Sequence, residues 1–181
     1  MKRARNFGLI ALSICAVSFL VAAGQQKDTT SLQGKKAPNF SLQTISGKDM
    51  SLAEEKGNVV VLDFWATWCP PCRASLPHLN AIHNDKELAD KGLKVYAVNL
   101  REEKKTASDY VKQNNLTFPV ALDKSGGVAN KYLVQGIPTT VVVGRNGKIA
   151  KVFVGYGDGM EKQLRNAIEN ALSAPKSGTG A

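Results

Sequence analysis

An apolar run leads directly into a cysteine pair in the stretch VVVLDFWATWCPPC, residues 59–72. The β-branched and aromatic side chains at 59–65 predict a buried strand. The residues after Trp68 are compatible with a helix, so the pair Cys69 and Cys72 is expected where a strand gives way to a helix N-terminus. Two cysteines separated by two residues can close a small disulfide there, and this context indicates a redox pair.

The two cysteines have different expected roles. The sulfur of Cys69 should lie near unpaired backbone N–H groups and the positive end of the helix dipole, which favour its thiolate. Free cysteine has a pKa near about 8.5, whereas such motifs lower it to roughly 3.5–7.5, and the thiolate is the form that attacks a disulfide. We therefore predict that Cys69 is the nucleophile and Cys72 the resolving thiol.

A zinc half-site and a static structural disulfide are the alternatives for this pair. A structural zinc site needs four ligands. The only other cysteine is Cys15, which lies in the N-terminal apolar segment. Zinc is therefore disfavoured, and no metal site is expected.

Asp63 places a carboxylate inside the apolar strand. Burial there is costly and would raise the pKa of the carboxyl group. Asp63 is then a candidate proton acceptor for Cys72 when that thiol attacks the mixed disulfide. The alternative is a less buried strand, in which Asp63 caps or hydrogen-bonds a neighbouring segment.

Pro70 and Pro71 carry no backbone N–H, so this loop offers the Cys69 thiolate fewer donors than most Cys-x-x-Cys loops. Moderate activation favours a reductant or isomerase over a strong oxidant, because strong oxidation requires a very stabilised reduced form. Arg73 could compensate for the missing donors. Trp65 and Trp68 could frame the disulfide or simply pack, and Trp68, next to Cys69, is the better candidate for contact with substrate.

Ile137 and Pro138 immediately precede another apolar strand, which is predicted to begin at Thr139. Proline at the first residue of a strand needs no ladder donor. If the bond before Pro138 is cis, backbone groups of Ile137 could lie beside Cys69, where an extended substrate would pair by strand addition. A trans proline leading into the strand is the alternative.

The two ends of the chain differ in composition from its middle. Residues 1–24 combine a basic start with an apolar run and small residues, which indicates an export signal, with cleavage favoured over retention as a membrane anchor. Residues 25–34 are expected to be a linker and 173–181 a disordered tail, leaving one domain at 35–172. The chain is then expected in the periplasm or on the extracytoplasmic face of a bacterial membrane.

The net charge is +9, and it becomes +6 without the three basic residues of segment 1–24. The lysines are scattered, so we interpret them as solvated surface and expect no nucleic-acid partner. A monomer is the default expectation.

The middle of the chain alternates between strand and helix patterns. Strands are predicted at 59–64, 94–100, 139–143 and 149–154, and helices at 73–91, 106–114, 126–132 and 160–172. This order predicts an α/β domain with parallel crossovers. Asn146-Gly147 predicts a two-residue hairpin turn that makes the last two strands antiparallel, so the central sheet should be mixed and flanked by helices.

The helix pattern at 73–91 contains one proline and two histidines. Pro77 should kink the helix unless the helix ends there. His78 and His83 are five residues apart, on different faces, and are interpreted as surface residues and not ligands.

These residues resemble the thioredoxin superfamily, and in particular its exported TlpA/ResA-like thiol-disulfide oxidoreductases. The resemblance covers nearly all of residues 35–172. It rests on APNFSL at 37–42, similar to an N-terminal hairpin, on the stretch 59–77, and on GIPTTVVVGRNGKIAKVFVGY at 136–156. Residues 102–135 are similar to the central helical insertion of this branch. A thioredoxin-like fold is implied.

By this resemblance, Cys69 and Cys72 correspond to the redox pair, Pro138 to the cis-proline, and Asp63 to the buried aspartate of thioredoxin. Members of this branch often carry Asn where Asp63 stands and Glu where Ser75 stands, so we hypothesise that Asp63 supplies the proton-transfer group here. The resemblance implies protein disulfides as substrates, with apocytochrome c as a possible one, and a membrane thiol-electron donor. The missing Glu weakens the transfer of the apocytochrome c role.

Two other functions remain as alternatives to a reductase without a cofactor. A copper-handling module is one, since paired thiolates suit Cu(I), with Met160 and the histidines as weak further ligands. A thiol peroxidase is the other. It is disfavoured because the Pro-x-x-x-Thr-x-x-Cys pattern is absent: Leu62 and Ala66 stand where Pro and Thr would be needed.

Overall fold

The computed structural model describes residues 27–175. The predicted signal or anchor at 1–24, Cys15 within it, and residues 176–181 of the predicted tail lie outside the described residues. None of the helices within 27–175 is both long and apolar enough to cross a membrane.

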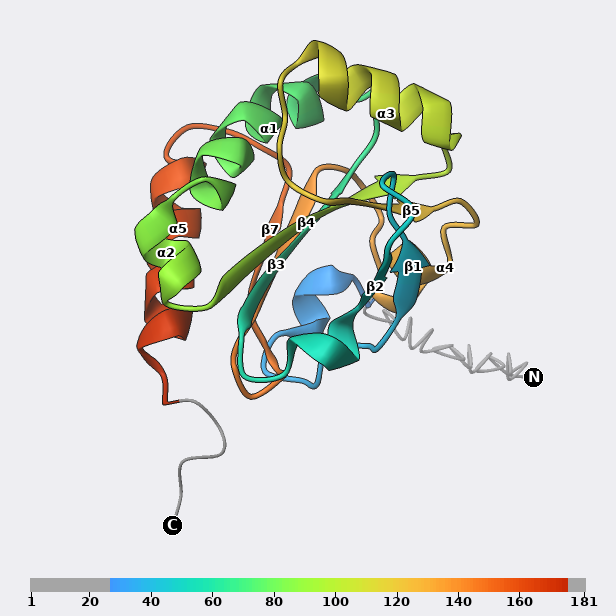
Figure 1. Ribbon diagram of the computed structural model, residues 1–181. Coiled ribbons are helices and arrows are strands. Elements are labelled where there is room, and N and C mark those ends of the chain that lie inside the picture. Colours follow the sequence, from blue (N-terminus) through green and yellow to red (C-terminus); the bar gives the residue numbers. More distant parts are fainter. Residues whose placement is uncertain (1–26, 176–181) are drawn as a thin grey trace, which may run out of the picture.

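A five-stranded mixed sheet forms the centre of the domain, with strand order β5-β4-β3-β6-β7 (Figure 1). Its strands are β3 (Val59–Trp65), β4 (Leu93–Leu100), β5 (Val120–Asp123), β6 (Thr139–Val143) and β7 (Ile149–Val154). β3 pairs in parallel with β4 and antiparallel with β6, and the last two strands are antiparallel. The predicted mixed sheet is therefore confirmed.

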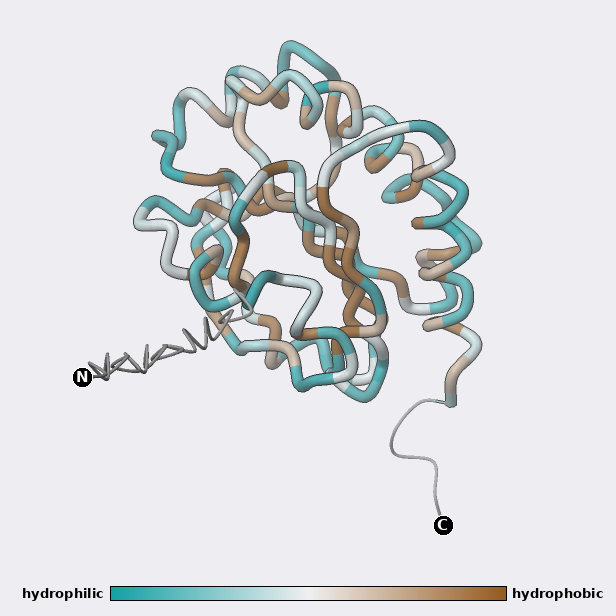
Figure 2. Tube along the Cα trace, turned by 180° about the vertical axis from the view of Figure 1, so that it is seen from behind, coloured by the Kyte–Doolittle hydropathy of each residue, from teal (hydrophilic) through white to brown (hydrophobic). Residues whose placement is uncertain are grey.

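β3 is buried along its whole length, as expected for a central strand covered on both faces. Because side chains alternate between faces, Val59 and Val61 belong to the apolar core on one face of the sheet, whereas Val60 and Leu62 belong to a second core on the other face. Asp63 has the same parity as Val61 and so points to the same face as Val61. Figure 2 shows the apolar residues concentrated in the central strands.

Five α-helices surround the sheet within the described residues: α1 (Pro70–His83), α2 (Lys86–Asp90), α3 (Lys104–Gln113), α4 (Gly127–Lys131) and α5 (Met160–Ser173). α1, α2 and α5 lie together on one side, and α4 lies on the other with the N-terminal hairpin (Figure 1). The flanking helices are therefore confirmed.

The single helix predicted at 73–91 is wrong, because the structure divides it. α1 continues through Pro77 to His83, and α2 begins after Asp85, whose side chain accepts a hydrogen bond from the Leu88 N–H. A capping aspartate inside the pattern provides the stop and restart. Pro77 thus neither ends α1 nor separates it from α2.

The hairpin between β6 and β7 has a different turn from the predicted one. Gly144 N–H donates to the Lys148 carbonyl at 2.9 Å, and Gly147 N–H donates to the Gly144 carbonyl at 2.8 Å. The loop therefore spans 145–147, with Gly147 at a φ of 72°. The antiparallel pairing is confirmed, but the two-residue turn is wrong, because Gly147 serves as the left-handed residue of a longer loop.

The N-terminal hairpin implied by the resemblance is present as β1 (Ser41–Gln43) and β2 (Asp49–Ser51). Before it, η1 (Thr29–Leu32) packs on the domain: the Thr29 hydroxyl donates to the Leu133 carbonyl at 2.9 Å, and Gly34 N–H donates to the Ile149 carbonyl at 2.8 Å. A second short 3-10 helix, η2 (Leu52–Glu55), follows β2. Contacts with the domain thus begin before residue 35.

Candidate active site

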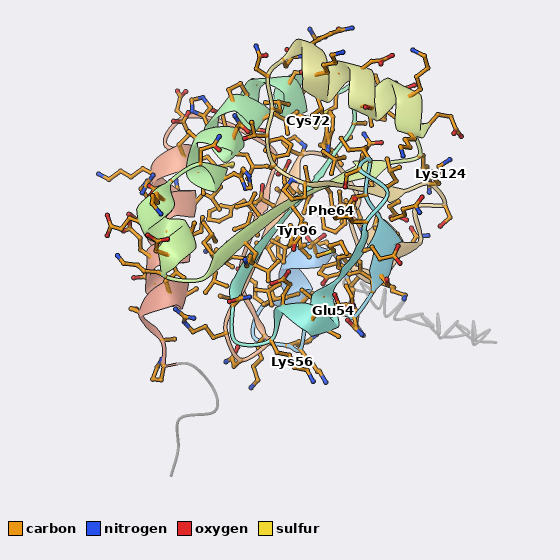
Figure 3. The ribbon with its side chains drawn as sticks, viewed as in Figure 1. Glu54, Lys56, Phe64, Cys72, Tyr96 and Lys124 are labelled. Carbon is orange, nitrogen blue, oxygen red and sulfur yellow. A yellow bond between two sulfur atoms is a disulfide. The ribbon has the colours of Figure 1, made fainter. Side chains whose placement is uncertain are left out.

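The two cysteines form a disulfide at the N-terminus of α1, with the sulfurs 2.05 Å apart. Cys69 is the N-cap residue, and the Cys72 N–H donates to its Sγ at 3.2 Å. Pro70 and Pro71 occupy the intervening positions and donate nothing. Cys69 is 3% exposed whereas Cys72 is 0% exposed, so Cys69 is the slightly more exposed of two buried residues. Figure 3 labels Cys72 at this end of α1, far from Lys56 at the opposite end of the sheet.

The segment before β6 lies beside the disulfide. The peptide bond between Ile137 and Pro138 is cis, as the sequence allowed and the resemblance implied. The Ile137 carbonyl oxygen is 3.7 Å from Cys69 Sγ. Pro138 and Thr139 are buried, and the Thr139 hydroxyl donates to the Gly136 carbonyl at 2.7 Å. The fold thus brings these residues to Cys69 from a distant part of the chain.

Trp68 supplies exposed apolar surface next to Cys69. It is 68% exposed, whereas Trp65 is fully buried and its ring lies 5.4 Å from that of Tyr110. Pro70 and Pro71 are also exposed. The preference for Trp68 over Trp65 as the aromatic available to a substrate therefore agrees with the exposure of the two rings.

Asp63 is buried in β3 with one hydrogen-bond partner. Its Oδ1 accepts from the Thr140 hydroxyl at 2.6 Å, and its Oδ2 has no partner among the described residues. Burial raises the pKa of Asp63 to about 7, against a smaller lowering by the Thr140 hydrogen bond. We therefore expect the carboxyl group to titrate near neutral pH. The strand is fully buried, which contradicts one part of the alternative, whereas the hydrogen bond from Thr140 of the neighbouring strand agrees with the other part.

A cavity of about 30 Å³ adjoins Asp63 between the sheet, α1 and α5, and Ser75 forms part of its wall. The Ser75 hydroxyl donates to the Cys72 carbonyl at 2.9 Å. The cavity therefore connects the surroundings of Asp63 with the residue that contacts the Cys72 backbone.

Glu102 is a site residue that the sequence analysis misses. Its carboxylate accepts from the Thr67 N–H at 2.8 Å, from the Thr67 hydroxyl at 2.5 Å, and from Asn99 Nδ2 at 2.6 Å. These bonds hold the turn that precedes Trp68 and Cys69. Thr67 and Glu102 are 35 residues apart in the sequence, so no local sequence pattern predicts their contact. From the sequence alone, Glu102 is indistinguishable from an ordinary charged surface residue.

Among residues 27–175, no group of three or more His, Cys, Asp and Glu side chains is arranged to hold a metal ion. Of the additional ligands considered for a copper site, His78 and Met160 line the cavity beside Asp63, whereas His83 does not. Neither Cys69 nor Cys72 lines this cavity.

A family model described as the AhpC/TSA family matches residues 33–152. The chain belongs to this family. It is also 35% identical over 166 residues to the thiol-disulfide oxidoreductase ResA of Bacillus cereus, covering 91% of each chain. The corresponding protein of Bacillus subtilis is 34% identical over 161 residues, covering 86% of this chain and 88% of that one.

Two solved structures share the fold of this chain. A putative thiol:disulfide interchange protein DsbE from Chlorobium tepidum aligns with a TM-score of 0.72 and 38% identity, over 78% of this chain and 98% of that one. StoA from Bacillus subtilis aligns with a TM-score of 0.62 and 33% identity, over 72% and 96%. Together with the Cys69–Cys72 disulfide, these relatives show a thioredoxin-like thiol-disulfide oxidoreductase of the ResA-like branch, and thus a redox enzyme.

Proposed function

We propose that the chain reduces disulfides of other proteins outside the cytoplasm. The direction of electron flow, from this protein to its substrate, is inferred from the small number of hydrogen-bond donors around Cys69. Its Sγ accepts a hydrogen bond from the Cys72 N–H, and the two prolines between the cysteines have no N–H to donate. A thiolate with few donors is only moderately stabilised, which keeps the reduced pair a good electron donor. The direction of electron flow is thus proposed from the same loop that supplies the nucleophile.

The chemistry proceeds in two exchange steps. The Cys69 thiolate attacks one sulfur of the substrate disulfide, which forms a mixed disulfide and releases the other substrate sulfur as a thiolate. Cys72, giving its proton to Asp63, then attacks Cys69 Sγ and expels the second substrate sulfur. Two electrons pass from the cysteine pair to the substrate, whose thiolates take up protons. The raised pKa of Asp63, about 7 because of burial, suits a group that accepts a proton near neutral pH.

The substrate segment binds around Cys69 in this proposal. Trp68, Pro70 and Pro71 provide apolar contact, and Ile137 to Thr139 provide the backbone beside which an extended chain adds as a strand. The 3.7 Å separation of the Ile137 carbonyl and Cys69 Sγ supports this arrangement. Selectivity would then come from exposed apolar surface next to the reactive sulfur.

The proposed setting of the enzyme is supported by the composition of its N-terminal segment and by its similarity to ResA. Residues 1–24 act as an export signal or anchor, a membrane thiol-electron carrier returns the pair to its reduced form, and the domain 35–172 works as a monomer without a cofactor. Protein disulfides are the substrates, apocytochrome c among them. By the resemblance to TlpA/ResA-like oxidoreductases, Ser75 stands where members of this branch often carry Glu, which supports Asp63 as the proton-transfer group in this chain.

The first test measures the reduction potential of the Cys69–Cys72 pair and the pKa of Cys69 from its alkylation rate against pH. A potential below about −200 mV with a pKa not far below 7 is expected for a reductant. A potential near about −120 mV with a pKa below about 5 would instead identify an enzyme that introduces disulfides.

Trapping experiments test the order of the two cysteines. Cys72→Ser should accumulate a mixed disulfide with an oxidised protein substrate, because the second exchange step is lost. Cys69→Ser is the matched control and should trap none. Equal trapping by the two variants would refute the assignment of Cys69 as the nucleophile.

A further inference from the structure

Three polar side chains form the outer part of the cavity beside Asp63. His78 comes from α1, Tyr156 from the segment after β7, and Glu161 from the first turn of α5. His78 Nε2 is 3.0 Å from Glu161 Oε1, and the Tyr156 hydroxyl donates to the same oxygen at 2.7 Å. The rings of His78 and Tyr156 are stacked, with centroids 6.0 Å apart.

This cluster reaches both the cavity and solvent. The side chains of His78 and Glu161 are 46% and 50% exposed, although both line the cavity that contains Asp63. The rest of the wall is mainly apolar, with Leu79 and Ile82 of α1 facing Phe153 of β7. The polar side chains of His78, Tyr156 and Glu161 therefore provide a path by which a proton could pass from Asp63 to solvent.

The cavity is large enough to complete that route. Its volume of about 30 Å³ exceeds the roughly 10–15 Å³ that one water needs, and a water there requires polar partners. Asp63 Oδ2 is buried without a partner among the described residues and would supply one of them. A water between this oxygen and the outer cluster would satisfy the carboxyl group and conduct a proton.

We propose that His78, held in place by Glu161, transfers protons between Asp63 and solvent. The inference rests on the proposed role of Asp63 as the acceptor of the Cys72 proton. In each oxidation of the pair, one proton passes from Cys72 to Asp63, so an Asp63 carboxyl group that starts protonated must first release its own proton. That proton passes through the cavity water to the imidazole, and from there to solvent, so that no other reactant is needed.

The other titratable groups of the cluster are poorly suited to this transfer. Burial and the adjoining carboxylates Glu161 and Asp158 raise the pKa of Tyr156 to about 12, so the phenol keeps its proton at neutral pH. Glu161 uses one oxygen to bind both Tyr156 and His78 and thereby orients the imidazole. Histidine is the side chain that ordinarily exchanges protons between about pH 5 and 8. His78 is accordingly a positioning and relay residue that acts through Asp63.

The test follows the reaction of the reduced enzyme with dithiobis(nitrobenzoate), a small chromogenic disulfide. The first thiol released reports the attack by Cys69, and the second reports the attack by Cys72. With His78→Ala, the second release should slow about 10-fold at neutral pH while the first is unchanged, since a proton-transfer group contributes to the second step alone. Added imidazole should restore the second release, because it fits the space that the variant opens.

Control variants separate this role from packing. His83→Ala removes the other histidine of α1, which packs edge-on against Phe118 outside the cavity, and should leave both releases unchanged with and without imidazole. Glu161→Gln keeps the shape of the cluster and should slow the second release less than His78→Ala does, without rescue by imidazole. In a protein that already carries Asp63→Asn, adding His78→Ala should not slow the second thiol release any further.

The outcomes distinguish this proposal from the proposed function. An unchanged second release in His78→Ala overturns the relay, as does a slowed release that imidazole fails to restore. If the unmodified protein shows no rapid first release, or if Asp63→Asn leaves the second release unchanged, then the assigned role of Cys69 or Asp63 has failed instead.

Discussion

Two carboxylates approach the active-site end of the sheet, and they are bound in opposite ways. Glu102 accepts three hydrogen bonds, two from Thr67 and one from Asn99. Asp63 accepts one, from Thr140, and leaves its second oxygen unpaired beside a cavity. On one side of the disulfide, the carboxylate of Glu102 is therefore held by several hydrogen bonds. On the other side, burial raises the pKa of the Asp63 carboxyl group to about 7.

The comparison shows that one carboxylate can hold the active-site loop in place while the other takes part in proton transfer. Hydrogen bonds to an ionised carboxylate stabilise its charge and hold their donors in place, so Glu102 fixes the turn before Cys69. A buried carboxyl group with few donors binds its proton more tightly, so Asp63 can take and release a proton at neutral pH. Changing each residue should consequently have effects of different sign and different pH dependence.

The largest effect is expected from Asp63→Asn. The folded-state pKa of about 7 lies above the ordinary value of 3.8, so the stability that the protonated form contributes is complete below the ordinary pKa, falls as pH rises from there, and is lost once pH passes the folded-state pKa. The total loss amounts to roughly 4 kcal/mol. Asn avoids it, so the variant should be more stable than the unmodified protein near pH 8 and similar near pH 4, while the second thiol release slows about 10- to 100-fold.

Urea denaturation at both pH values, with the disulfide intact, checks the stability part of this prediction. Asp123→Asn is the matched control, because Asp123 is equally buried in β5 but accepts a hydrogen bond from the Ala129 N–H at 2.8 Å. It should lose stability and gain none near pH 8. An Asp63→Asn variant that is less stable than the unmodified protein near pH 8 would contradict the account.

Glu102→Gln should have the next largest effect and the opposite sign. The amide cannot accept all three hydrogen bonds, and hydrogen bonds to charged groups contribute about 1.5–3 kcal/mol each. The free energy of unfolding should therefore fall by roughly 1–3 kcal/mol, without the dependence near pH 7 expected of Asp63. Glu103→Gln is the control: Glu103 pairs with Lys124 at the surface, 2.9 Å apart, and its loss should cost under about 0.5 kcal/mol. Equal losses in the two variants would remove the special role of Glu102.

Thr140→Val tests the single donor that Asp63 has. This hydrogen bond lowers the pKa of Asp63 against the larger effect of burial, so its removal should raise the pKa further. The midpoint of the second thiol release against pH should move upward by about 1 unit. A midpoint that stays in place or moves downward would show that another group governs the profile.

Thr67→Val should have the smallest effect. It removes the hydroxyl donor to Glu102 but keeps the Thr67 N–H that also binds the carboxylate. We expect a loss of about 0.5–1.5 kcal/mol in the free energy of unfolding and an unchanged pH midpoint, measured as for the other variants. A shift of the midpoint would mean that the two carboxylates are coupled across the disulfide.

Local patterns in the sequence predict the fold and the reacting atoms well. The apolar run at 59–65 and the cysteine pair after it lie in β3 and at the start of α1, as expected. The burial of Asp63 also follows from its apolar neighbours in the strand. β5 is missing from the predicted strands because Val120–Asp123 is short and lies within a segment without clear strand alternation.

Long-range contacts account for what the sequence could not predict. Glu102 reaches Thr67 because each follows one of the parallel neighbours β4 and β3. Glu161 reaches His78 because α5, which follows the antiparallel β6–β7 hairpin, lies beside α1. The spacing of His78 and His83 indicates only that they lie on different faces of a helix. Which face borders the cavity depends on how α1 packs against α5.

The fluorescence of the two tryptophans of the chain can report the redox state of the Cys69–Cys72 pair. Trp68 is largely in water and Trp65 is fully enclosed, so the two indoles should fluoresce at different wavelengths. A disulfide quenches nearby indole emission, so reduction should brighten the protein without any attached dye. A substrate lying over Trp68 would shift only the longer-wavelength component, which would allow docking and electron transfer to be timed separately in one sample.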